Sequence, residues 1–177
     1  HAMITLKEYG TNELFKFAKK YLTRNYAPNP DFILAKGKGC WMYDIRGKKY
    51  LDMLSCYSAL NIGHRHPAVM AHLHTQLNTL TTNANCFLEE QNIAFRKELV
   101  EFCARAGVMP SDAMAIIMNS GAEAVETAMK IARKWAYTRK KIPLNGAELI
   151  FAKNNFHGRT LGAISASTTK QYRKLFG

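Results

Sequence analysis

The sequence has no hydrophobic run long enough to cross a membrane, and it contains no internal repeat or low-complexity segment. A membrane-spanning helix needs about 20 consecutive apolar residues. No stretch resembles a secretion signal. Hydrophobic residues make up 47% of the 177 positions, which is enough to form a packed core. We therefore expect a folded protein outside the membrane, in the cytoplasm, with the mitochondrial matrix left open.

Cysteine is scarce, and no two cysteines are close in sequence (Cys40, Cys56, Cys86 and Cys103). Zinc sites and disulfide frameworks usually need closer or more numerous cysteines. Residues 63–67 carry two histidines at i and i+2, but without acids or cysteines beside them. We therefore expect reduced thiols and no metal site, with metal or disulfide use as the weaker alternative.

Acidic residues are also few, because 13 Asp and Glu stand against 25 Lys and Arg, a formal net charge of +12. Such an excess raises the question of a nucleic-acid partner. The basic residues lie in small scattered groups, and no RNA- or DNA-binding motif accompanies them. We expect no nucleic-acid partner. A non-enzymatic basic module that binds nucleic acid or a phosphorylated ligand is the alternative of a different class.

Hydrophobic periodicity predicts strands that alternate with helices. Helices are predicted over residues 11–24, 67–80, 90–106 and 122–138, with another from 161 or 168. Short strands and turns are predicted within 32–54, and apolar strands at 113–118 and 148–152. This alternation favours an α/β fold with a mainly parallel sheet covered by helices on both faces.

Two parts of the chain differ in character. Residues 1–60 are rich in short strands and turns, and we interpret them as an N-terminal arm and small-domain segment. Residues 61–177 contain the alternating pattern, and we interpret them as the first part of a larger domain.

A turn of small residues follows the predicted strand at 113–118 and opens the next helix. It reads Asn119-Ser120-Gly121-Ala122. The first backbone N–H groups of a helix lack partners within the helix, and the positive end of the helix dipole lies there. Gly121 and Ala122 would let an anion approach the backbone closely. The turn therefore predicts a site for a phosphate or another anion.

Residues 154–160 follow the predicted strand at 148–152, at the strand end where α/β folds bind ligands. Phe156 offers a flat apolar face, His157 a ring with polar edges, and Arg159 a fork that grips carboxylates. Spacing alone equally allows a loop with a core Phe and a surface Arg. Lys153 could form a Schiff base at this edge, but its neighbours do not support that role.

Together these stretches resemble the first part of a class III aminotransferase, a pyridoxal-phosphate (PLP) enzyme of fold type I. The resemblance runs from about Tyr26 to the end of the sequence. It rests on matches in family order at residues 37–39, 43–52, 63–67, 120–124 and 156–160. Each match alone would be weak, but the ordered set is specific.

Within the class, the sequence most resembles ornithine δ-aminotransferases, through residues 25–28, 54–61, 119–121 and 133–137. His157 departs from this pattern, because several ornithine enzymes carry Trp there. Histidine is common at this place in acetylornithine and 4-aminobutyrate aminotransferases, which are the alternatives.

The resemblance implies roles for particular residues. Ser120, Gly121 and Ala122 would hold the PLP phosphate through their backbone, and Phe156 and His157 would contact the cofactor. Arg159 would bind a substrate carboxylate, and Tyr26 and Tyr57 would line the substrate pocket, although spacing alone equally allows two core tyrosines. The implied reaction transfers the δ-amino group of ornithine to 2-oxoglutarate in a homodimeric enzyme.

The resemblance also implies what this sequence lacks. In the family, an aspartate that pairs with the pyridine nitrogen and a lysine that binds the cofactor covalently lie further along the chain. Neither family context occurs here. We therefore expect no catalytic residue in this segment, which would be an inactive N-terminal part of the enzyme.

Overall fold

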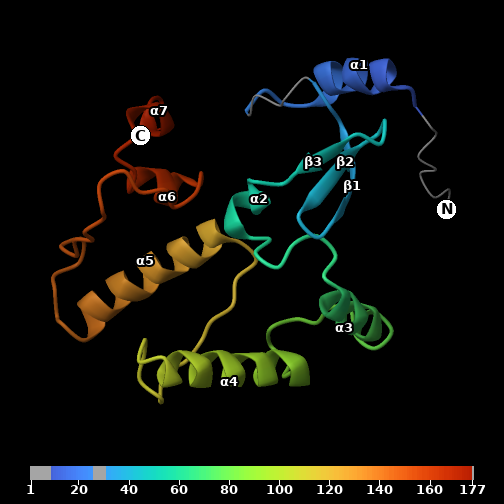
Figure 1. Cartoon of the computed structure of the whole chain (residues 1–177). Helices are drawn as coiled ribbons and strands as arrows, with labels where there is room; N and C mark the ends of the chain where they lie inside the picture. The colour runs from blue at the N-terminus through green and yellow to red at the C-terminus, as the bar shows by residue number, and fades with distance from the viewer. Residues whose placement is uncertain (1–8, 26–30, 177) are drawn as a thin grey trace. The chain divides into compact units, whose positions relative to one another are not determined.

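The structure is a computed structural model that describes residues 9–25 and 31–176 (Figure 1). Tyr26 lies outside the described residues. The chain divides into two compact units, His1–Ala84 and Asn85–Gly177. The sequence predicted a domain boundary after residue 60. That boundary refers to the domains of a complete enzyme, not to these two units, and it stays a prediction.

The first unit combines helices with a small antiparallel sheet. Its elements are α1 (Thr11–Tyr21), β1 (Leu34–Lys38), β2 (Trp41–Asp44), β3 (Lys49–Leu51), α2 (Ser55–Ser58) and α3 (Pro67–Leu77). The sheet order is β1-β2-β3, with both pairs antiparallel (Figure 1). Residues 32–54 thus form the predicted strands and turns. Helix α1 begins after Gly10, which is its N-cap residue.

The turn between β2 and β3 is organised by Asp44, whose side chain is only 5% exposed. Its Oδ1 accepts the backbone N–H groups of Arg46 and Lys48, each at 2.9 Å, and its Oδ2 accepts the Tyr50 hydroxyl at 3.0 Å. Burial opposes ionisation, but the bonds from Lys48, Tyr50 and Arg46 outweigh it and lower the pKa of Asp44. Gly47 completes the turn with φ +82°, where a Cβ would be strained.

We predict that Asp44→Asn makes the free energy of unfolding less dependent on pH in the acidic range. Because folding lowers the pKa of Asp44, the carboxylate stabilises the fold above its ordinary pKa of 3.8, and this contribution is lost as the pH falls through the folded value. Thermal unfolding followed by circular dichroism should therefore show a shallower acid limb in the variant. Asp112→Asn, at an exposed position, is the matched control. Identical acid limbs in Asp44→Asn and wild type would contradict this account.

The second unit contains α4 (Glu90–Arg105), α5 (Gly121–Thr138), α6 (Leu161–Ser165) and α7 (Lys170–Arg173) (Figure 1). Their bounds confirm the predicted helices. Helix α4 begins where the Glu89 carboxylate accepts the N–H groups of Gln91 at 2.9 Å and Asn92 at 2.7 Å. Such a side-chain cap satisfies donors that the first helical turn leaves unpaired.

The two strands predicted at 113–118 and 148–152 do not form within the described residues, where both segments are irregular. A strand requires a neighbour for its backbone hydrogen bonds, and these two segments do not pair with each other. An arginine supplies one such bond instead, because Arg96 Nη1 donates to the Ala115 carbonyl at 3.2 Å. The apolar side chains Met114 and Ile150 are 96% and 100% exposed.

Buried apolar side chains are few in the described part of the chain. Ala163 and Ile164 of α6 are buried, whereas many large apolar side chains on both units are exposed. No helix among the described residues is long and apolar enough to cross a membrane. The described residues also contain no cluster of three or more potential metal ligands. The four cysteines are unpaired.

Candidate functional site

The predicted anion site lies at the first turn of α5. Ser120 is the N-cap residue, with extended backbone (φ −145°, ψ 161°), and its hydroxyl oxygen accepts the N–H of Glu123 at 3.2 Å. The Ser-x-x-Glu spacing is typical of a capping box. Apart from its chain neighbours and the adjacent backbone of α5, no described residue has an atom within 4 Å of where a Cβ on Gly121 would be. The turn therefore presents backbone N–H groups beside open space.

The loop at 156–160 packs directly on this turn. Gly158 has φ +121°, and a Cβ built there would lie 2.7 Å from the Ala122 Cβ. Only glycine allows both this backbone conformation and this close approach. The two sequence motifs, whose contacting residues Ala122 and Gly158 are 36 positions apart, therefore meet in one place.

Thr160 and Glu126 fasten the loop to α5. The Thr160 hydroxyl donates to Glu126 Oε1 at 2.6 Å, and its oxygen accepts the N–H of Ala163 as the cap of α6. The same carboxylate lies against Gly162, where a Cβ would come within 2.5 Å of Glu126 Oε1. A side chain on the second turn of α5 thus sets the position of both the loop and α6.

Phe156 and Arg159 share a partner on α7 that the sequence did not indicate. The Phe156 and Tyr172 rings meet edge to face, with centroids 6.0 Å apart. The Arg159 guanidinium carbon lies 4.3 Å from the Tyr172 ring centroid. Such contacts restrict both the ring and the guanidinium group. Phe156 is still 62% exposed, so a flat ligand could pack against it.

His157 contacts Phe151 rather than the rings around Phe156. The His157 and Phe151 ring centroids are 5.6 Å apart and the planes are tilted by 59°. The neighbouring Asn155 fixes the loop, because its amide nitrogen donates to the carbonyls of Ala152 at 2.7 Å and Ala166 at 2.9 Å. The role of His157 at a cofactor stays a prediction.

Tyr57 lies in the other compact unit, on an unusual turn. The residue is 81% exposed. Element α2 is left-handed, because Ser55, Cys56, Tyr57 and Ser58 have φ values of 50°, 49°, 56° and 70°. For residues other than glycine this conformation costs roughly 1–2 kcal/mol each. Four such residues in succession persist only where surrounding bonds impose them.

The structure thus brings five of the predicted residues into one neighbourhood of the second unit: Ser120, Gly121, Ala122, Phe156 and Arg159. The sequence did not predict the contacts that Glu126, Thr160 and Tyr172 make in this neighbourhood. No local sequence pattern predicts a bond between residues 34 positions apart.

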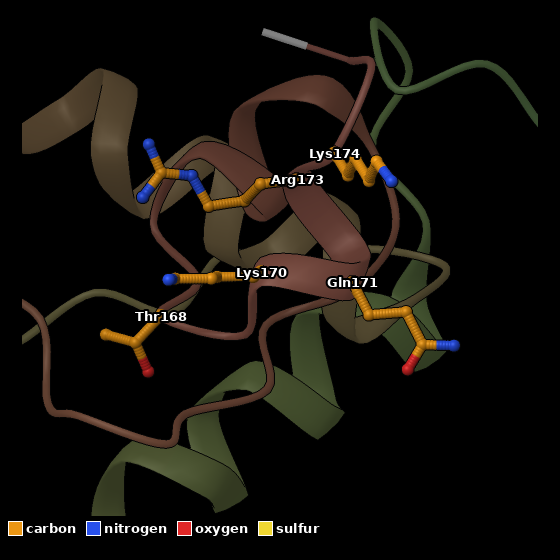
Figure 2. A pocket seen from close by; sticks show the side chains of 5 residues that line it. All are labelled: Thr168, Lys170, Gln171, Arg173 and Lys174. Atoms are coloured by element: carbon orange, nitrogen blue, oxygen red, sulfur yellow. The ribbon is translucent and has the colours of Figure 1, made fainter.

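A separate cavity of 410 Å³ adjoins α7 and does not include the predicted site residues (Figure 2). It is lined by Thr168, Lys170, Gln171, Arg173 and Lys174. Figure 2 shows Lys170 and Arg173 extending to one side of α7, and Gln171 and Lys174 to the other. The cationic groups therefore do not converge on one point, as a phosphate-binding cluster requires.

Comparison with known proteins decides the family. The model of the family described as aminotransferase class III matches residues 21–177. The chain belongs to this family. This confirms the resemblance found in the sequence. Class III aminotransferases are PLP-dependent enzymes of fold type I, in which a mainly parallel sheet forms the large domain.

Named relatives of this class III aminotransferase chain include ornithine enzymes. It is 43% identical over 167 residues to the ornithine aminotransferase of Brevibacillus brevis, an alignment that covers 94% of this chain and 40% of the relative. The chain therefore spans about 40% of the length of the curated relatives that it matches.

Solved structures of the family also match the fold. The ornithine aminotransferase of Toxoplasma gondii ME49 superimposes with a TM-score of 0.81 at 38% identity, covering 97% of this chain and 39% of that one. The acetylornithine aminotransferase of Elizabethkingia anophelis gives 0.73 at 38% identity, covering 84% of this chain and 35% of that one. These matches confirm the predicted fold class.

The residues present fit the phosphate and ring of PLP. The first turn of α5 offers unhindered N–H groups at the positive end of an 18-residue helix. The exposed face of Phe156 lies on the loop that Gly158 holds against Ala122. An anion and an attached flat ring would thus meet suitable groups from one contiguous region.

We predict that Thr160→Val loosens this region, whereas Thr160→Ser preserves it. Valine keeps the shape but loses both the bond to Glu126 and the cap of α6, so we expect a loss of about 1–2 kcal/mol in the free energy of unfolding. Chemical denaturation of the complete protein would measure it. Equal stability of the valine and serine variants would show that these bonds do not hold the loop.

Proposed function

We propose that this chain is part of a PLP-dependent aminotransferase whose amino donor is ornithine, used through its δ-amine, and whose acceptor is 2-oxoglutarate. The observation that carries the proposal is the contact between the turn at 120–122 and the loop at 156–160. Identity of about 40% to several ornithine aminotransferases supports the donor. An acetylornithine or 4-aminobutyrate donor is the second candidate, favoured by His157 and by the match to an acetylornithine enzyme.

In this proposal, backbone N–H groups bind the phosphate of the cofactor and a side chain contacts its ring. Bound PLP supplies the electron sink for exchange of the amino group. The N–H groups of Gly121 and Ala122, with Ser120, bind its phosphate. Phe156 covers one face of the ring and keeps water from it, while Glu126 holds the loop in place through Thr160.

Substrate binding would use charge and shape. The Arg159 guanidinium, oriented by its contact with Tyr172, forms a two-point bond with a substrate carboxylate. Tyr57 and Tyr26 line the part of the pocket that receives the α-amino or carboxylate end of ornithine. The δ-amine at the opposite end then reaches the cofactor. We further expect a cytoplasmic homodimer without a nucleic-acid partner.

The donor is tested by kinetics of the complete protein loaded with PLP. We expect glutamate to form from ornithine and 2-oxoglutarate with a higher kcat/KM than from acetylornithine or 4-aminobutyrate. Ornithine turnover no better than acetylornithine turnover would favour the second candidate. Absence of turnover with all three donors, together with salt-sensitive binding of random-sequence DNA, would instead favour a basic non-enzymatic module.

Arg159→Gln should weaken binding of the 2-oxo acid far more than it changes folding. Loss of a two-point charged bond to carboxylate is worth about 2–3 kcal/mol, so we expect kcat/KM for 2-oxoglutarate to fall roughly 100-fold. Arg173→Gln on α7 is the matched control, because Arg173 lines the separate cavity. A comparable loss in both variants would rule out a specific role for Arg159.

Residues 1–177 alone should show no transaminase activity. The family contexts of the cofactor-binding lysine and of the aspartate at the pyridine nitrogen do not occur in this sequence. The same assay, with the purified segment and added PLP, tests this. Sustained glutamate formation by the segment would contradict it.

A further inference from the structure

The left-handed turn that carries Tyr57 is bonded at both of its ends. At its start, Asp52 Oδ1 accepts the N–H groups of Leu54 at 3.1 Å and Ser55 at 2.8 Å. At its end, the Ser55 hydroxyl donates to the Leu60 carbonyl at 2.9 Å, and the Leu60 N–H donates back to the Ser55 carbonyl at 3.0 Å. Hydrogen bonds therefore constrain the turn at both ends, and those at its N-terminal end are accepted by one carboxylate, that of Asp52.

Asp52 is in turn held by a histidine from the far side of the turn. His64 Nε2 lies 2.8 Å from Asp52 Oδ2, and the Asp52 side chain is only 6% exposed. The bonds from Ser55 and His64 lower the pKa of Asp52, so the carboxyl group is ionised at neutral pH. The carboxylate thus joins His64 to the two backbone groups that open the turn.

His64 itself is fixed by strand β1 and the residue that follows it. Its backbone exchanges two hydrogen bonds with Gly39, of 2.8 and 2.9 Å. Its ring lies over Gly37, where a Cβ would come within 2.5 Å of the His64 Cγ. The absence of a side chain at Gly37 therefore gives the imidazole its place beside Asp52.

We propose that His64 and Asp52 act as a positioning pair that imposes the left-handed turn at residues 55–58 and so sets where the Tyr57 ring stands. This inference rests on the proposed function, in which Tyr57 contacts the amine substrate. His64 is a positioning residue, because it acts through Asp52 and does not touch the substrate. Binding of the amine donor, rather than of the 2-oxo acid, depends on this pair.

Hydrogen exchange of the complete protein tests the pair without any assay of activity. His64→Leu removes the bond to Asp52, and we expect amide exchange at Leu54 and Ser55 to accelerate about tenfold, the effect of one lost hydrogen bond. His64→Gln, whose amide can donate from a similar place, should restore slow exchange. His66→Leu, in the same segment, is the matched control. Unchanged exchange in His64→Leu would overturn the proposal.

Gly37→Ala provides a second route that leaves the histidine in the sequence. Its added methyl group would displace the imidazole, so exchange at Leu54 and Ser55 should again accelerate. Gly10→Ala is the control, because no described residue other than its chain neighbours has an atom within 4 Å of the added carbon. Acceleration in Gly10→Ala equal to that in Gly37→Ala would count against the pair.

Half-reaction kinetics then test the consequence for function. In the PLP-loaded His64→Leu variant, the KM for the amine donor should rise about tenfold, while the half-reaction with 2-oxoglutarate stays unchanged. A parallel loss in both half-reactions would indicate a general structural defect and contradict the proposal. If the wild type does not use ornithine, the proposed function fails, whereas the exchange experiment still decides whether the pair holds the turn.

Discussion

The bond between Thr160 and Glu126 is the interaction on which the arrangement of the site depends. It joins the loop at 156–160 to α5 across 34 positions of sequence, at a distance of 2.6 Å. The close approach of Gly158 to Ala122 allows this bond to form, and the cap of α6 uses the same hydroxyl. Without it, the turn that suits a phosphate and the ring that suits a flat cofactor would be independent segments.

Much of the local structure could be predicted from the sequence because it depends on neighbouring residues. Periodicity predicted α4 and α5 nearly to their ends, and the turn of small residues at 119–122 marked the start of α5. The segments at 113–118 and 148–152 show the limit, because a strand exists only beside another strand. The apolar composition of these two segments predicted strands of a buried sheet, as in the family fold. This chain spans only about 40% of the length of its relatives.

The sequence predicted which residues belong to the site, but it did not predict how they contact one another. Glycine and arginine in residues 154–160 indicated a ligand loop, whereas Glu126 and Tyr172 carry no local signal for their contacts with it. The left-handed turn at Tyr57 was equally hidden, because its residues are not glycines and its support comes from His64 and Asp52. Long-range hydrogen bonds and ring contacts, rather than propensities, decide these features.

The central claim is that the first turn of α5 and the Phe156 loop together receive one cofactor. An experimental structure of the complete protein with PLP bound tests it most directly. We expect the phosphate to lie within hydrogen-bond distance of the N–H groups of Gly121 and Ala122, with the ring against Phe156. A phosphate bound elsewhere, or a ring that does not contact Phe156, would contradict the account.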